Sequence, residues 1–281
     1  MKIEPTPAKA VADKKKVKIG DYSPTFRIDP TPLRGPSFND HFSGVAAGYA
    51  TFRPTYPAWL YAAIAQAAQK NRCVWDVGCG SGQASVALAE HFDEVVATDA
   101  SSEQIGRAQL HPAVRYAVAP AEASGLPSHS CNAITIAQAL HWFDHARFFA
   151  EARRVATPNA PIVAWAYGRL ACAADIKAIF DDYYDHIVGP FWPPEGRHAD
   201  NGYSELPWPF PRIDFGVFEL AVDWTLDEFA GYIGTWSATA RYRKARGEDP
   251  VPALHARLAA VWGRERRTLR WPLRVLAGRV A

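Results

Sequence analysis

The sequence has few cysteines, little net charge and no long apolar run. Four cysteines, Cys73, Cys79, Cys131 and Cys172, occur among its 281 residues, and their spacing is not that of metal ligands. We therefore expect reduced thiols packed in the core and no bound metal. No apolar run approaches the length that crosses a bilayer, and the N-terminal residues lack an apolar signal segment. These absences predict a cytoplasmic protein that does not bind a membrane.

The formal net charge of +2 at pH 7 is too small to indicate a nucleic-acid partner. Residues 1–40 carry eight Lys or Arg and five Asp or Glu, so the rest of the chain is close to neutral. Hydrophobic residues make up 48% of the sequence and charged residues 21%, which is ordinary for a globular protein. The length suits one large α/β domain with an insertion or a small lid.

Residues 1–40 differ in composition from the rest of the chain. They contain six prolines and three consecutive lysines, Lys14 to Lys16, with little periodic apolar pattern. This composition predicts an extended N-terminal tail, followed by one domain over residues 41–281. A basic arm that binds an acidic partner is the alternative.

The most informative stretch is a short apolar run followed by a glycine-rich turn. Residues Cys73 to Val77 are apolar and partly β-branched, which predicts a strand buried on both faces. Gly78, Gly80 and Gly82 follow, and they let the backbone turn tightly and approach a ligand without a Cβ in the way. Apolar residues at helical spacing come next, so free N–H groups at the start of a helix would face an anionic group there.

A second strand, Glu94 to Asp99, places an acid after this unit. Asp99 lies seventeen residues after Gly82, at the expected carboxyl end of the strand. A carboxylate at that position is placed to accept hydrogen bonds from two ribose hydroxyls. The stretch therefore predicts a site for a ligand that contains a nucleoside.

The spacing of the three glycines separates two interpretations. A dinucleotide fingerprint is G-x-G-x-x-G and would indicate a nicotinamide-dependent oxidoreductase. Here the glycines run G-x-G-x-G, and Asp76 precedes the first by two residues. This arrangement resembles the cofactor loop of the class I S-adenosylmethionine-dependent methyltransferases. A glycine-rich turn that binds nothing is the remaining alternative.

The resemblance implies an α/β fold. The family has a Rossmann-like, seven-stranded, mostly parallel sheet in the order 3-2-1-4-5-7-6, with helices on both faces and an inserted lid. The resemblance also implies S-adenosyl-L-methionine as the cofactor and S-adenosyl-L-homocysteine as its product. The residues that it assigns to the cofactor in and after the glycine turn are Asp76, Gly78, Cys79, Gly80, Gly82, Gln83, Asp99 and Ala100.

The segment before the first strand resembles a more specific group. Residues Tyr49 to Pro57 match a Y-x-x-x-R-P-x-Y-P element of the methyltransferase type 11, trans-aconitate methyltransferase-like subgroup. In that subgroup the element folds over the cofactor, which implies a lid over residues 41–57 with Tyr49 and Arg53 facing the site. Packing of the aromatic residues onto the sheet is the alternative. An Ala-rich amphipathic helix, about Ala58 to Gln69, is expected next.

The stretch Ala119 to Pro127 resembles the family's G-D-A-E-x-L-P segment, which contacts the adenine ring. Pro120 stands where the family has an aspartate, so the usual contact with the adenine amino group is in doubt. The resemblance leaves this role to the backbone of Ala121 and to Glu122. A third strand, Ala113 to Val118, should lie just before this segment.

A fourth strand, Cys131 to Ala137, leads into the sequence Gln138-Ala-Leu-His141-Trp142-Phe-Asp. In open α/β sheets ligands lie beyond the carboxyl ends of the strands, so this segment is expected to face the reacting methyl group. We predict that Gln138, His141, Trp142 and Arg53 act on the acceptor, with Gln138 also near the cofactor. His141 could remove a proton from a hydroxyl or amine, Arg53 could pair with a carboxylate, and the Trp142 ring could face the sulfonium. A hydrogen-bonded core histidine is the alternative for His141.

The second half of the chain carries the expected substrate side. Residues 171–215 are rich in aromatic residues and proline, which predicts an insertion that builds the substrate pocket. The remaining elements expected are a helix from Asp144 to Val155, a strand from Pro161 to Tyr167, a strand near 216–222, a helix containing 227–229 and the 232–238 run, a helix from 253 to 266, and a final antiparallel strand from 268 to 280.

The function that these patterns favour is S-adenosylmethionine-dependent methyl transfer to the oxygen, nitrogen or carboxylate of a small molecule. The reaction would be an in-line displacement in which the protein orients the two reactants. A catalytically silent cofactor-binding or scaffold protein is an alternative, and a nicotinamide-dependent oxidoreductase is a less favoured one. The sequence is compatible with a monomer or a homodimer.

Overall fold

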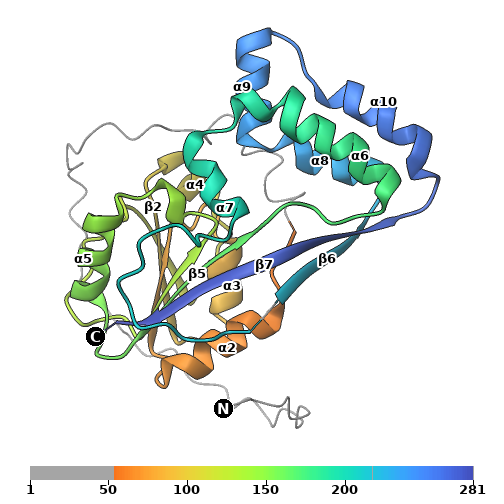
Figure 1. The fold of residues 1–281 in the computed structure, drawn as a ribbon. Coiled ribbons are helices and arrows are strands. Elements are labelled where there is room, and N and C mark those ends of the chain that lie inside the picture. The colour runs from red at the N-terminus through yellow and green to blue at the C-terminus, as the bar shows by residue number, and fades with distance from the viewer. Residues whose placement is uncertain (1–53, 217, 281) are drawn as a thin grey trace. The chain divides into compact units, whose positions relative to one another are not determined.

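The computed structural model describes residues 54–216 and 218–280, shown in colour in Figure 1. The chain divides into two compact units, Met1–Gly35 and Pro36–Ala281, and the described residues all belong to the second unit. The predicted tail over residues 1–40 lies outside the described residues. Tyr49, Arg53 and all but the last four residues of the predicted lid also lie outside them.

A seven-stranded sheet in the order β3-β2-β1-β4-β5-β7-β6 forms the centre of this unit. Its strands are β1 (Cys73–Val77), β2 (Glu94–Asp99), β3 (Val114–Val118), β4 (Ala133–Ala137), β5 (Pro161–Tyr167), β6 (Phe218–Trp224) and β7 (Arg267–Arg279). Strands β1 to β5 pair in parallel, whereas β7 runs antiparallel to both β5 and β6. The predicted fold and strand order are confirmed.

Strand β1 lies in the middle of the parallel part and is buried along almost its whole length. It pairs with β2 on one side and β4 on the other, with Trp75 opposite both Val96 and Ile134. The indole Nε1 of Trp75 donates to the hydroxyl of Thr98 at 2.9 Å, which locks the register of β1 against β2. Because the three strands are parallel, their carboxyl ends meet at one edge of the sheet.

Helices cover both faces of the sheet. On one face α2 (Ala58–Ala68) and α3 (Gln83–Leu88) pack with Val74 in one apolar cluster. On the other face α5 (His145–Val155) packs Phe148 and Phe149 against Trp75 in a second cluster. Val74 and Trp75, which are neighbours in β1, thus pack in different apolar clusters on the two faces of the sheet, as the two-residue period of a strand requires. A short helix, α4 (Ser102–Gly106), follows β2.

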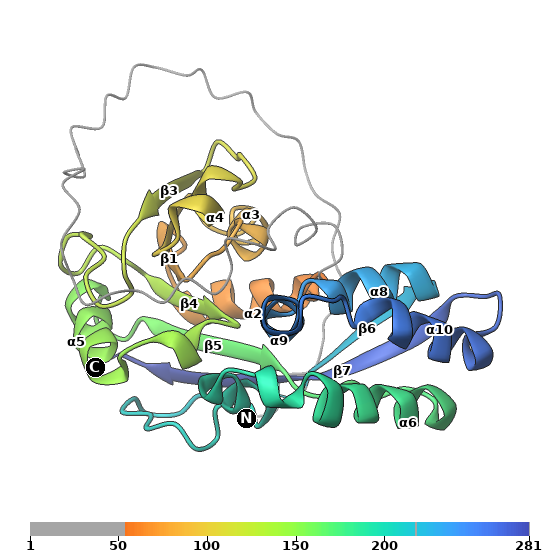
Figure 2. The ribbon, with the colours of Figure 1, turned by 90° about the horizontal axis from the view of Figure 1, so that it is seen from above.

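A third apolar cluster lies where the second half of β6 pairs with the first half of β7. It is built by α6 (Ala174–Asp182), α8 (Leu226–Gly234), α9 (Ser237–Arg246) and α10 (Val251–Trp262). Figure 2 shows these helices gathered around the same end of the long strand β7. Among the described residues no helix is long and apolar enough to span a membrane.

Several helices end earlier than the sequence pattern predicts. The helix after Asp99 stops at Gly106 instead of about Leu110, and the last helix stops at Trp262 because Gly263 takes a φ of +78°. The expected helix through 227–238 is two helices, because the chain takes an extended conformation at Trp236, with a ψ of 143°. Helix α6 ends in a π turn, Tyr183–Ile187, and a helical turn α7 (Arg197–Asp200) follows later in the insertion.

Candidate functional site

The glycine turn lies where the chain changes direction across the sheet. From β1 the chain continues outward to β2 and β3, and from β4 it continues to the other side, so the carboxyl ends of β1 and β4 border the switch in strand order. The N–H groups of Gly78 and Cys79 both donate to the carbonyl of Thr98, at 2.8 and 3.0 Å. These bonds tie the turn to the end of β2.

The three glycines have different surroundings. A Cβ on Gly78 would lie 2.6 Å from that of Ala139, and one on Gly82 would lie 2.0 Å from the hydroxyl of Tyr116, so these two glycines are required for close packing. A Cβ on Gly80 would meet nothing closer than Oε1 of Gln104, at 3.9 Å. Gly80, with a φ of +55°, is therefore the glycine that leaves its backbone open to a ligand.

Asp99 contacts the glycine turn directly. Its Oδ2 accepts from the N–H of Gly80 at 2.8 Å, and its Oδ1 accepts from the N–H of Ser101 at 2.8 Å. These two bonds fix the orientation of the carboxylate at the turn. The structure thus brings together two residues that the sequence places nineteen positions apart.

Asp76 is fully enclosed by protein. It accepts from the hydroxyl of Ser85 at 2.6 Å and from that of Thr135 at 3.0 Å, so it links β1 to α3 and β4. Burial raises the pKa of Asp76 to about 6, against the effect of these two hydrogen bonds, and the nearby charge of Asp99 adds to the rise. Its predicted role as a direct cofactor ligand stays a prediction.

The other predicted cofactor residues lie around the same edge. Cys79 is buried, and its Sγ lies 3.5 Å from the carbonyl of Gly80. Gln83 donates from Nε2 to the carbonyl of Pro54 at 3.3 Å, so the start of α3 contacts the first described residue of the chain. Ala100 is half-buried. It lies between Asp99 and Ser101, whose N–H donates to the carboxylate of Asp99.

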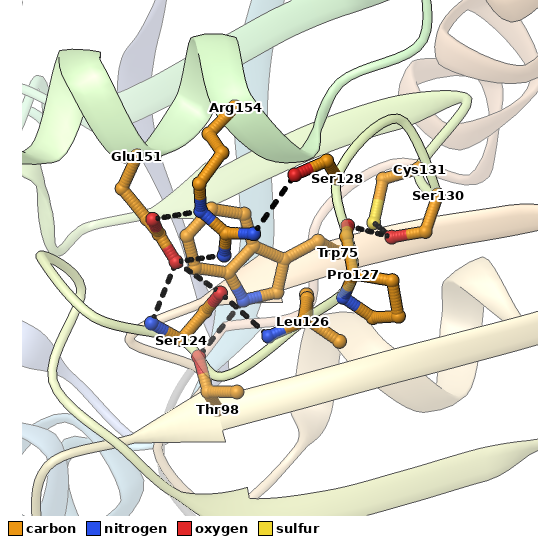
Figure 3. A network of polar contacts seen from close by, with 10 residues as sticks. All are labelled: Trp75, Thr98, Ser124, Leu126, Pro127, Ser128, Ser130, Cys131, Glu151 and Arg154. Atoms are coloured by element: carbon orange, nitrogen blue, oxygen red, sulfur yellow. Dashed lines mark hydrogen bonds and ion pairs between the residues drawn. The ribbon is translucent and has the colours of Figure 1, made fainter. Parts of the chain in front are cut away.

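The segment that carries Ala121 and Glu122 is held against α5. Glu122 accepts from the N–H of Asp144 at 2.8 Å, immediately before α5 begins. Figure 3 shows how Glu151 of α5 accepts from both the N–H and the hydroxyl of Ser124 while it pairs with Arg154. This network anchors the loop. Ala121, which lies on the loop, is buried.

Two buried polar atoms at this edge have no partner among the described residues. One is Oε1 of Gln104, which is also the atom nearest to the open side of Gly80. The other is Nε2 of Gln138, which follows β4 with a φ of +57°. Buried polar atoms without a partner are costly, so these two amides favour a bound ligand at this edge. No sequence pattern singles out Gln104.

His141 lies in the turn of 3₁₀ helix Leu140–Trp142 and is almost completely buried. Its Nδ1 lies 3.3 Å from the hydroxyl of Tyr203. Burial lowers the pKa of His141 to about 3, and neighbouring His198 and His145 contribute in the same direction. The imidazole is therefore neutral near pH 7.

Tyr203 is the partner of Nδ1 of His141. Burial raises the pKa of Tyr203, against the effect of a hydrogen bond with the backbone of Leu140. The hydroxyl of Tyr203 donates to Nδ1 when Nε2 carries the imidazole proton, and it accepts when Nδ1 carries the proton. Nε2 has no partner among the described residues and is not one of the fully enclosed polar atoms, so it stays accessible.

A pocket of about 120 Å³, partly open to solvent, begins at the end of β4, and we call it the aromatic pocket. Gln138, His141 and Trp142 all line it, so the structure brings these three predicted residues together. The other lining residues are Tyr167, Gly168, Arg169, Leu170, Phe180, Tyr184, Trp192, Pro193, Gly196, Ala199, Asp200, Tyr232, Trp236, Ser237 and Trp271.

Only part of the aromatic insertion lines this pocket. Phe180, Tyr184 and Trp192 do so, whereas Trp208 and Phe210 pack edge-on against Phe149 of α5. The second half of the insertion therefore contributes to the core under α5. Other rings of the pocket come from α8, β7 and the segment between α8 and α9, far along the chain from the insertion.

Comparisons with known proteins agree on one family. The family model described as a methyltransferase domain matches residues 75–164. A protein of Dictyostelium discoideum named as a methyltransferase is 32% identical over 229 residues, which cover 80% of this chain and 86% of the relative. A yeast protein named as an S-adenosylmethionine-dependent methyltransferase is 28% identical over 131 residues, 43% of this chain and 45% of the relative.

A solved structure is also similar. The structure of a protein from Anaeromyxobacter dehalogenans, described as a type II methyltransferase, superposes with a TM-score of 0.75. The two sequences are 43% identical, and the match covers 82% of this chain and 98% of the other. The similarity therefore extends over most of both chains.

Proposed function

Because the chain belongs to the class I S-adenosylmethionine-dependent methyltransferases, we propose that it transfers a methyl group from S-adenosylmethionine to a small-molecule acceptor held in the aromatic pocket. The proposed reaction is an in-line displacement. The protein contributes by holding the two reactants in line, which can account for several kcal/mol of the barrier.

The residues at the glycine turn fit the cofactor. Asp99 holds its carboxylate at the turn, where ribose hydroxyls would donate to it, and the open side of Gly80 lets a ligand approach the backbone. The unpartnered amide oxygen of Gln104 beside Gly80 offers a further acceptor. We therefore assign the cofactor's nucleoside to Asp99 and its neighbours. Ala121 and Glu122 lie on the anchored loop that would border the adenine.

When bound, S-adenosylmethionine supplies a methyl group that its sulfonium has already activated. The chain places two carboxylates at the turn, and the charge of Asp99 contributes to raising the pKa of Asp76. Their negative charge favours a cationic group nearby. The neutral imidazole of His141 adds no opposing positive charge on the side of the pocket.

On the acceptor side, Gln138, His141 and Trp142 form the border between the turn and the aromatic pocket. We assign His141 an orienting role as a hydrogen-bond donor through Nε2, which requires that the hydroxyl of Tyr203 donate to Nδ1. Gln138 supplies an amide that has no protein partner for its nitrogen among the described residues. Both residues would hold an acceptor oxygen in place for the transfer.

The observation that carries the proposal is the bond between Asp99 and the N–H of Gly80, with the open side of Gly80 beside it. The test is isothermal titration of the protein with S-adenosylhomocysteine, with NADH as the competing ligand. We expect S-adenosylhomocysteine to bind and NADH not to bind. The opposite result would favour an oxidoreductase.

A matched pair of variants sharpens this test. Gly80→Ala and Gly247→Ala both add a Cβ at a positive φ where no atom lies close, so their backbone strain is similar. Only Gly80 lies at the turn. We expect Gly80→Ala to weaken S-adenosylhomocysteine binding at least tenfold and Gly247→Ala to leave it unchanged. Binding without turnover on any acceptor would favour the silent cofactor-binding alternative.

A further inference from the structure

One wall of the aromatic pocket consists of rings that contact one another. The centroid of Trp236 lies 5.3 Å from that of Trp192, 5.7 Å from that of Tyr184 and 5.5 Å from that of Tyr232. Tyr184 and Trp192 are 5.1 Å apart with their planes tilted by 37°. The planes of Tyr184 and Tyr232 are nearly perpendicular to that of Trp236, and the plane of Trp192 is tilted from it by 44°. Rings this close leave no room for a ligand between them, so they form a wall that can present both ring faces and ring edges.

This wall is held in place before any ligand binds. Tyr184 belongs to the π turn after α6, and its hydroxyl donates to Asp200 at 2.7 Å. The guanidinium of Arg169 lies 4.5 Å from the centre of the Tyr184 ring and pairs with Asp185 at 2.8 Å. Because these contacts fix the rings, a flat ligand can stack on them with little loss of side-chain freedom.

The charged groups of the pocket do not favour an ionic ligand. Arg169 and Asp200 are the charged residues among the described lining, and they have opposite signs. Arg169 already pairs with Asp185 and covers a ring of the wall, where a cationic ligand would otherwise stack. Asp200 already accepts a hydrogen bond from the hydroxyl of Tyr184. The formal charges of the described lining residues thus cancel.

Two buried N–H donors of the pocket have no partner among the described residues. They are the indole Nε1 of Trp192 and the amide Nε2 of Gln138. Nε2 of His141 is a third donor when the hydroxyl of Tyr203 donates to Nδ1. Donors of this kind pair with an oxygen of the ligand, such as a phenol or carbonyl oxygen.

We propose that the aromatic pocket binds a flat, uncharged aromatic molecule that packs against the rings of Trp192 and Trp236 and turns an oxygen toward the N–H groups at its border. This inference rests on the proposed function, because it names the class of methyl acceptor for that site. It selects against saturated rings, which have neither the face nor the edge of an aromatic ring.

The test compares the binding of 2-naphthol with that of its saturated counterpart, decahydro-2-naphthol, with and without S-adenosylhomocysteine. The saturated compound is the more apolar of the two, so burial of apolar area alone favours it. We expect 2-naphthol to bind at least tenfold more tightly in a titration followed by tryptophan fluorescence and calorimetry. Equal or tighter binding of the saturated compound would overturn the inference.

Three variants locate the binding. Trp192→Leu should weaken 2-naphthol binding at least fivefold and leave decahydro-2-naphthol nearly unchanged, whereas Trp192→Phe should restore most of the affinity. Trp59→Leu is the control, because Trp59 is a partly exposed ring on α2 that stacks on Phe218 outside the pocket. An identical response to Trp192→Leu and Trp59→Leu would contradict the inference.

The titration with S-adenosylhomocysteine separates the two proposals. If S-adenosylhomocysteine binds and 2-naphthol has no preference over the saturated compound, the inference fails and the proposed function stands. If 2-naphthol binds as expected and S-adenosylhomocysteine does not bind, the pocket assignment holds and the proposed function fails.

Discussion

The hydroxyl of Tyr203 lies 3.3 Å from Nδ1 of His141, in a part of the structure where Tyr203 has no exposed surface. The two residues are 62 positions apart and come from different parts of the chain, since Tyr203 lies in the insertion and His141 follows β4. If the hydroxyl donates to Nδ1, Nε2 is protonated and His141 can donate a hydrogen bond to the acceptor. If Nδ1 is protonated, Nε2 can instead remove a proton from the acceptor, so the tautomer decides the role of His141.

Replacing Tyr203 by phenylalanine keeps the buried ring and removes the hydroxyl beside Nδ1. We expect turnover to fall about tenfold with little change in KM for the acceptor, because the orientation of His141 contributes mainly in the transition state. Nitrogen NMR of labelled histidine should show Nδ1 unprotonated in the wild type and a mixture of tautomers in Tyr203→Phe. Unchanged turnover and an unchanged tautomer would contradict this role.

Substituting Gln138 or His141 should affect the acceptor and not the cofactor. Both residues line the aromatic pocket, and neither contacts the glycine turn through a hydrogen bond among the described residues. Gln138→Ala and His141→Ala should lower turnover while S-adenosylhomocysteine affinity stays within about twofold. Calorimetry and steady-state kinetics on the same protein samples give both quantities. A wild-type rate in His141→Ala at every pH would remove its assigned role.

Asp99→Ala should weaken cofactor binding at least tenfold. Charge-assisted hydrogen bonds to ribose hydroxyls are worth roughly 1.5–3 kcal/mol each. The same substitution removes the acceptor for the N–H groups of Gly80 and Ser101, so the turn loses its support as well. Asp93→Ala, at an exposed carboxylate just before β2, is the control. Wild-type affinity in a folded Asp99→Ala protein would withdraw the cofactor assignment.

Asp76 should make stability depend on pH in a particular direction. Burial raises its folded-state pKa to about 6, above the unfolded value near 4, so the folded protein binds this proton more tightly. The contribution is fully present below about pH 4 and is lost as the pH rises through about 6. A shift of about two units corresponds to roughly 3 kcal/mol.

The variant Asp76→Asn isolates this effect. The amide keeps the shape of the carboxyl group and cannot ionise, so the free energy of unfolding of the wild type should fall relative to the variant by that amount between pH 4 and 7. Urea denaturation at several pH values measures the difference. The exposed Asp93→Asn is the control. A constant difference between wild type and Asp76→Asn across this range would show that Asp76 does not titrate there.

The sequence by itself determined the parts of the fold that depend on local pattern. The buried apolar run of β1, the three glycines and the acid at the end of β2 act over fewer than thirty residues, and each has one conformation that suits it. Resemblance to the family then supplied the strand order, which the structure confirms. The caps at Ser101 and Asp144 are also visible locally, since each side chain accepts from an N–H three residues on.

The tertiary structure decided which distant side chains meet. The pairing of Tyr203 with His141 and the unpartnered amide of Gln104 leave no sequence signal, because they depend on how separate segments pack against the sheet. The same packing gives the aromatic residues of the insertion different positions. Trp192 lines the pocket, whereas Trp208 packs against Phe149 of α5. Aromatic rings bury well against any apolar neighbour, so their composition predicts burial but cannot select the partner. That choice is made by the geometry of the completed core.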